Sequence, residues 1–225
     1  MQLDLSKFQL SASSRKNEDI EWSINYVFNR NDPDSPRFLI VGDSICNGYQ
    51  QVLREKLSAN ASLSFWASSY CVTDLMYLPA LDQVCNGPRP DLIIFNNGLH
   101  SLKSDRKEWE EAFTLVLKFI MAKFPGIPLA VLNSTPLADR DTRVDEINEM
   151  TARAAERLHL PLWDIFSLCK EFDPSCWRDN YHFSPEAIGM QAEFLAGKIL
   201  PLLPVKGNKV TIQASTETGP DGALK

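Results

Sequence analysis

The chain has 225 residues, 44% of them hydrophobic, and its 23 basic and 29 acidic side chains give a formal net charge of −6. A chain of this size and composition can bury a core without disulfide bonds or a structural metal, which excludes a disulfide scaffold and a disordered protein. Nucleic acids and anionic membranes are bound mainly through Lys and Arg, so the acidic balance argues against both as partners and against polyanionic substrates.

The cysteines and the N-terminal sequence indicate the cellular compartment of the protein. Five cysteines without a C-x-x-C pair predict reduced, mostly buried thiols. No stretch approaches the ~18 apolar residues of a membrane span, and the N-terminus has no cationic segment followed by an apolar run. We therefore expect a cytoplasmic protein.

Residues 1–36 are polar and irregular, apart from a short apolar patch within 20–28. We expect this region to be an N-terminal extension that packs on the domain. The ordered pattern begins with the apolar run 38–41, closed by Gly42, which predicts a strand buried on both faces. Further apolar runs that predict strands lie at 63–66, 92–95, 129–132 and 160–163.

The segments between these runs show helical spacing. The clearest helix carries apolar residues from Trp109 to Phe124, with Ser104 as a candidate N-cap. The next helix has its apolar face within 144–158, and the last begins with Ser184 as cap and Pro185 at the first helical position. The C-terminal stretch 206–225 is rich in Gly, Ser and Thr and predicts a disordered tail.

Strand and helix alternate five times over residues 37–205. This alternation predicts an α/β domain of three layers, α/β/α, with a doubly wound, five-stranded parallel sheet. Ligands of such sheets bind at the carboxyl ends of the strands. The residues that follow each apolar run are therefore the place to look for chemistry.

Ser44 follows the first strand in the run Gly42-Asp43-Ser44, just before a helical stretch. A serine on a sharp strand-to-helix turn exposes its hydroxyl and holds its N–H near the positive end of the helix, which suits a nucleophile whose attack creates an oxyanion. Gly-Asp-Ser is also ordinary turn chemistry, so the motif alone leaves both interpretations open.

Two further sequence motifs contain a histidine. The third strand ends in Asn96-Asn97-Gly98-Leu99-His100, which by itself could be an Asn-Gly turn with a solvated histidine. Asp179 precedes His182 by three residues, an offset that lets the carboxylate accept Nδ1–H and leaves Nε2 as a base. Because the sequence has only three histidines, a chance pairing of Asp and His in a surface turn is less favoured.

Together these pieces resemble the SGNH (GDSL-type) hydrolase superfamily of esterases and acyl hydrolases, over about residues 37–200. The resemblance implies a flavodoxin-like fold with Ser44 as nucleophile, His182 as general base and then acid, and Asp179 as the orienting acid.

The resemblance also implies an oxyanion hole. The G-x-N block of the superfamily aligns with Gly98-Leu99-His100, so a histidine stands where asparagine usually donates. The run from Asn96 through Asn97 to His100 looks like a subgroup with N-N-G-L-H in this block, in which His100 would be a variant donor. The second block normally supplies a glycine N–H, and this chain has no glycine there. We favour Ser69 as the backbone donor, with Cys71 as the competitor.

The expected function is hydrolysis of a small acyl ester, acetyl above all, on a small molecule or oligosaccharide, without a cofactor. The alternatives are a short-chain lipid esterase or thioesterase of the same mechanism, and a non-catalytic carbohydrate-binding relative. No His, Asp, Glu or Cys cluster has metal-ligand spacing, so no metal site is predicted. Cys46 as a thiol nucleophile and a catalytic His159 are both less favoured than structural roles.

Overall fold

The computed structural model describes residues 5–204. Its centre is one six-stranded sheet in the order β1-β3-β2-β4-β5-β6. The strands are β1 (Ser23–Val27), β2 (Arg37–Gly42), β3 (Ser62–Ser68), β4 (Leu92–Phe95), β5 (Leu129–Leu132) and β6 (Leu162–Trp163). Strands β2 to β6 are parallel to their neighbours, and β1 pairs antiparallel with β3 at the edge.

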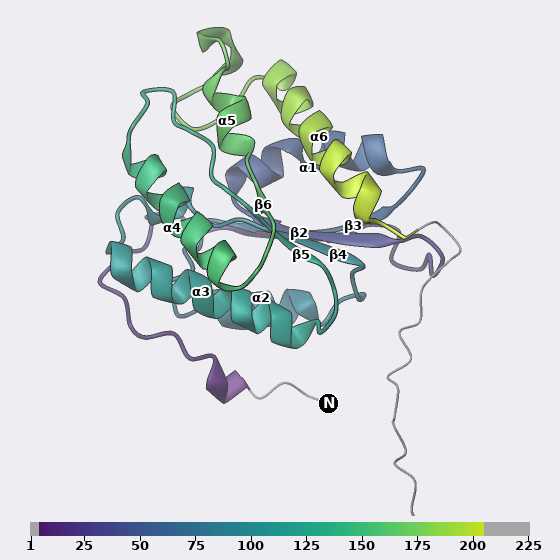
Figure 1. The fold of residues 1–225 in the computed structure, drawn as a ribbon, viewed down its shortest axis with the longest axis horizontal. Coiled ribbons are helices and arrows are strands. Elements are labelled where there is room, and N and C mark those ends of the chain that lie inside the picture. Colours follow the sequence, from purple (N-terminus) through teal and green to yellow (C-terminus); the bar gives the residue numbers. More distant parts are fainter. Residues whose placement is uncertain (1–4, 205–225) are drawn as a thin grey trace, which may run out of the picture.

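Six α-helices in the described part of the chain cover the sheet in two layers. They are α1 (Ser44–Leu57), α2 (Tyr77–Cys85), α3 (Arg106–Lys123), α4 (Arg143–Arg157), α5 (Ile165–Lys170) and α6 (Pro185–Ile199). Helices α1, α5 and α6 lie on one face, and α2, α3 and α4 lie on the other (Figure 1). The predicted three-layer α/β fold with five parallel strands is confirmed. No helix within the described residues is long and apolar enough to cross a membrane.

The central strands form where the sequence is mostly apolar, because both faces of the sheet are covered. Every residue of β2, β3, β4 and β5 is buried. Strand β1 differs, since all five of its residues are exposed or half-buried at the edge of the sheet. The sequence analysis placed this segment in the extension 1–36 and did not predict a sixth strand. The predicted tail 206–225 lies outside the described residues.

Helix starts follow the side chains that can accept the first free N–H groups. The predicted cap of α6 is confirmed, because the Ser184 hydroxyl accepts from the N–H of Ala187. The predicted cap of α3 is wrong by one residue. The carboxylate of Asp105 accepts from the N–H groups of Lys107 and Glu108, which leaves Ser104 outside the helix.

The chain path reverses its direction across the sheet beside β2. The connection after β2 leads to β3 on one side, and the chain then returns to β4 on the other side. In doubly wound sheets this reversal is the point at which ligands bind, at the carboxyl ends of the strands. Ser44 follows β2 there, and the run from Asn96 to His100 follows β4.

Gly98 allows two segments to approach closely at this edge. A Cβ atom on Gly98 would lie 1.8 Å from Ser134 Oγ, 3.0 Å from Ser134 Cβ and 3.2 Å from Ile147 Cγ2. The hydroxyl can rotate away, but Ser134 Cβ is fixed by its backbone. The turn that carries His100 can therefore pack against the end of β5 only with glycine at this position.

We expect Gly98→Ala to lower the free energy of unfolding by about 1–3 kcal/mol, the usual cost of overpacking. Gly189→Ala is the control, because a Cβ there meets nothing within 4 Å in the interior of α6. That change should stabilise the protein by about 0.5–1 kcal/mol through helix propensity. Urea unfolding of both variants measures the two values. Equal effects would show that the contact with Ser134 is not tight.

Candidate active site

Ser44 is the first residue of α1, and its position follows from the cap before it. The carboxylate of Asp43 accepts from the N–H of Ile45, and the carbonyl of Asp43 accepts from the N–H of Asn47. The N–H of Ser44 itself is one of the groups that a helix start leaves without an intrahelical partner. The helix dipole adds positive potential at the same place.

His182 and Asp179 lie in a loop that is closed at its base. Trp177 and Phe183 form an antiparallel bridge, and their rings pack with centroids 4.3 Å apart. Within the loop, His182 Nδ1 lies 2.8 Å from Asp179 Oδ2 and 3.0 Å from Oδ1. The carboxylate therefore fixes a proton on Nδ1, and Nε2 is left as the acceptor.

The two halves meet across 138 residues of chain, since His182 Nε2 lies 2.9 Å from Ser44 Oγ. The carboxylate of Asp179 is held in its charged form. Partial burial alone would raise its pKa, but hydrogen bonds from the N–H of Tyr181, from the His182 ring and from the N–H of His182 outweigh that effect and lower the pKa to about 2. Serine, imidazole and carboxylate thus form one continuous chain of hydrogen bonds.

A cavity of about 180 Å³ opens beside this chain of hydrogen bonds. It lies between the start of α1 and the start of α6, and both polar and apolar side chains line it. They are Ser44, Ile45, Asn47, Gly48, Arg178, His182, Phe183, Ile188 and Gln191. The serine hydroxyl and the imidazole therefore border a space into which a small group can enter.

The two asparagines after β4 hold backbone rather than face that cavity. Asn97 is buried, its Oδ1 accepts from the N–H of Val72 at 3.0 Å, and its Nδ2 donates to the carbonyl of Tyr70 at 2.8 Å. Asn96 Nδ2 donates to the carbonyl of Leu132 at 2.8 Å. Asn97 therefore fixes the loop after β3 against the end of β4, while Gly98 provides the close packing described above.

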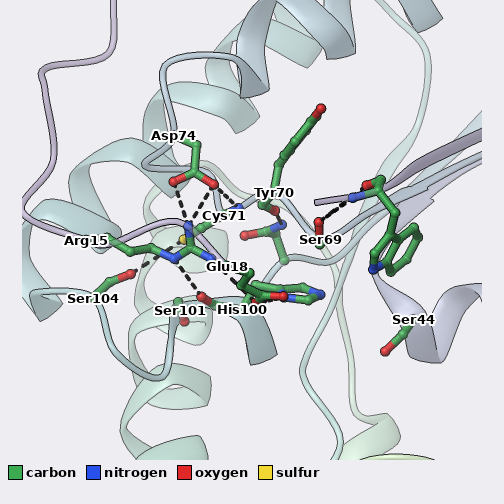
Figure 2. Close-up of polar contacts among 12 residues, drawn as sticks. Arg15, Glu18, Ser44, Ser69, Tyr70, Cys71, Asp74, His100, Ser101 and Ser104 are labelled. Atoms are coloured by element: carbon green, nitrogen blue, oxygen red, sulfur yellow. Dashed lines mark hydrogen bonds and ion pairs between the residues drawn. The ribbon is translucent and has the colours of Figure 1, made fainter. Parts of the chain in front are cut away.

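His100 has an acidic partner that the sequence did not indicate. Its Nδ1 lies 2.6 Å from Glu18 Oε1, and its ring packs edge-on to Trp22 with centroids 6.4 Å apart. Figure 2 shows the ring extending from Glu18 toward the side of the site on which Ser44 lies. Both partners of the imidazole come from the N-terminal extension.

The loop after β3 does not offer the predicted backbone donors. The N–H of Ser69 donates to the carbonyl of Trp22, and the N–H of Cys71 donates to Asp74 Oδ2 at 2.7 Å. Both groups are therefore occupied, which corrects the choice of Ser69 or Cys71. Between them, the N–H of Tyr70 donates to no acceptor within residues 5–204. Tyr70 replaces them as the candidate in this loop.

The remaining histidine and the cysteines have structural positions. His159 lies two residues beyond the end of α4, in the left-handed region with φ of 54°, where the chain turns toward β6. All five cysteines are free and buried. Burial raises the pKa of the Cys46 thiol well above its usual value, which disfavours the thiolate that a nucleophile would need. Within residues 5–204 no group of three His, Cys, Asp or Glu side chains could hold a metal ion.

Comparison with known proteins shows the fold. No protein-family model and no curated protein matches the chain. An acetyl xylan esterase structure matches at 15% identity and a TM-score of 0.63, over 72% of this chain and 99% of that one. A carbohydrate esterase family 3 structure from Talaromyces cellulolyticus matches at 15% identity and a TM-score of 0.60, over 74% and 97%.

A third similar structure is a lipase/acylhydrolase from Enterococcus faecalis, at 15% identity and a TM-score of 0.57, over 76% of this chain and 98% of that one. These likenesses span nearly the whole length of the three proteins and most of the described part of this one. The chain therefore shares its α/β fold with these three structures.

Proposed function

We propose that the protein is a serine esterase that hydrolyses small acyl esters. The observation that carries this proposal is the chain of hydrogen bonds from Ser44 through His182 to Asp179, with distances of 2.9 and 2.8 Å, at the reversal point of the sheet. A nucleophile, a base and a third group that orients the base are the parts that acyl transfer requires.

In the proposed reaction, Ser44 Oγ attacks the acyl carbonyl carbon while His182 Nε2 takes the hydroxyl proton. The tetrahedral intermediate collapses by breaking the bond to the alkoxy oxygen, and His182 returns the proton to the leaving alcohol. Water then attacks the acyl-serine with His182 again as base, which releases the acid and restores the Ser44 hydroxyl. Asp179 keeps the imidazole in the tautomer that can accept the proton.

Three groups are candidates to stabilise the oxyanion. The N–H of Ser44 lies at the positive end of α1, and the N–H of Tyr70 has no protein acceptor within residues 5–204. His100 stands where the resemblance places an asparagine donor. Donors of this kind act where negative charge develops, and removal of one typically costs ~10²–10³ in kcat.

The substrate we favour is an acetyl ester of a carbohydrate. The cavity beside Ser44 is small, about 180 Å³, and its lining combines Phe183 and Ile188 with polar groups such as Asn47 and Gln191. A small acyl group fits such a space better than a long chain. Two of the similar structures are an acetyl xylan esterase and a carbohydrate esterase, which supports the same class of substrate.

Hydrolysis of p-nitrophenyl esters from acetyl to octanoyl, and of acetylated xylan oligosaccharides, tests this function. We expect the acetyl ester to have the highest kcat/KM, and Ser44→Ala to lower kcat by more than about 10³-fold because the nucleophile is lost. Ser58→Ala, just beyond the other end of α1, is the control and should retain full activity. A preference for octanoyl would indicate a lipid esterase, and no turnover of any ester would indicate a binding protein.

Asp179→Asn tests the role of the acid. An amide can donate to Nδ1 and so favour the tautomer that cannot accept the Ser44 proton, and we expect kcat to fall roughly 10²-fold, less than for a buried acid, because this side chain is 48% exposed. Asp173 caps the short 3-10 helix Pro174–Cys176 and lies outside the triad, so Asp173→Asn should retain the wild-type kcat. An unchanged kcat in Asp179→Asn would remove the acid from the mechanism.

The pKa of Asp179 also sets a pH dependence. Because the folded pKa, about 2, lies below the ordinary value, the hydrogen bonds to this carboxylate stabilise the fold above about pH 4, and this contribution is lost as pH falls toward 2. Acid unfolding of the wild type should therefore depend on pH over this range more steeply than that of Asp179→Asn.

A further inference from the structure

The N-terminal extension reaches the candidate active site through a buried arginine. The Arg15 side chain is only 2% exposed, and its Nη1 lies 2.8 and 2.9 Å from the two carboxylate oxygens of Asp74. Its Nε donates to the carbonyl of His100 at 3.0 Å. One guanidinium therefore joins the extension to the loop after β3 and to the turn after β4 (Figure 2).

Asp74 extends this network into the loop that carries the backbone donor. Its Oδ2 also accepts from the N–H of Cys71, next to the N–H of Tyr70. Loss of one partner would leave a buried charge without compensation, so the pair holds the two loops in one arrangement. The network thus fixes both segments from which we expect oxyanion donors, and it does so with a residue of the extension.

Glu18 follows three residues after Arg15 and faces His100. Its Oε1 lies 2.6 Å from His100 Nδ1 and 3.6 Å from Arg15 Nη2. The Glu18 side chain is 41% exposed, whereas the His100 side chain is 14% exposed. Within residues 5–204 the carboxylate of Glu18 makes polar contacts with His100 and Arg15 alone, and the contact with His100 is the shorter of the two.

The contact with Glu18 determines which ring nitrogen of His100 carries a proton. A carboxylate only accepts, so Nδ1 of His100 must carry a proton, and the nitrogen left for the reaction is Nε2. An asparagine always has an N–H to donate, but Nε2 of this ring donates only when both nitrogens carry protons. The carboxylate of Glu18 lies where it can balance the charge of that ring, and Arg15 is the other charged group that contacts His100.

We propose that Glu18 is a positioning residue for the proposed esterase, which holds the His100 ring through Nδ1 so that Nε2 can donate to the oxyanion. The inference rests on the proposed function. It also gives a physical reason why a histidine can stand in the place of the usual asparagine. A ring with protons on both nitrogens is charged, and the extension supplies the carboxylate that balances this charge, whereas an asparagine amide needs no such partner.

A double-mutant cycle tests this role. We expect Glu18→Gln to lower kcat for the acetyl ester roughly tenfold, a part of the ~10²–10³ that a whole donor contributes, with KM unchanged within about twofold. In the His100→Asn background the same change should have no further effect, because the ring on which Glu18 acts is gone. Glu21→Gln, an equal charge change on the same segment, should leave kcat unchanged.

A proton NMR measurement separates this inference from the proposed function. The short hydrogen bond between Nδ1 of His100 and Glu18 should give a downfield ring proton that disappears in both Glu18→Gln and His100→Asn and remains in Asp179→Asn. A wild type that shows this proton but hydrolyses no ester would overturn the proposed function and leave the contact intact. If the wild type is active, the inference is overturned when the ring proton persists in Glu18→Gln. It is also overturned when Glu18→Gln lowers kcat by the same factor with and without His100.

Discussion

The hydrogen bond between Ser44 Oγ and His182 Nε2 is the interaction on which the candidate site depends, because its two halves lie 138 residues apart. Helices α1 and α6 lie together on one face of the sheet, and both begin at the edge where the parallel strands end (Figure 1). Ser44 is the first residue of α1, and His182 and Asp179 lie in the loop that leads into α6. A Cβ on Gly48 of α1 would lie 3.8 Å from Ile188 of α6, and Lys56 pairs with Glu193 near the other end, so the two helices keep a fixed relative position.

The second half of the site is organised by charge. Arg15 is buried against Asp74 in the loop after β3 and against the carbonyl of His100 in the turn after β4. Buried ion pairs contribute little net stability but penalise any arrangement that separates them. The pair thereby links the loop after β3 to the turn after β4, and Glu18, three residues after Arg15, contacts His100. Residues that precede β1 in this way contact both loops of the candidate site.

Features that depend on neighbouring residues in the sequence could be predicted, whereas contacts between residues far apart in the chain could not. The parallel strands could be predicted, and Ser44, Asp179 and His182 could be chosen as candidates, because apolar runs and short motifs are local. Strand β1 was missed because an edge strand lacks a buried run, and this omission explains the choice of Ser69, whose N–H is taken by the continuation of β1 at Trp22. Arg15 and Glu18 carry no local signal, since their partners lie 59 and 82 residues away.

We propose that His182 activates Ser44 as a nucleophile, and covalent labelling with a fluorophosphonate probe can test this activation without a known substrate. Peptide mass spectrometry should find the phosphonyl adduct on Ser44 of the wild type. The His182→Ala protein, shown to be folded by circular dichroism, should remain unlabelled under the same conditions, because its serine hydroxyl has no base. Labelling of Ser44 at the wild-type rate in His182→Ala, or no labelling of the wild type, would contradict the claim.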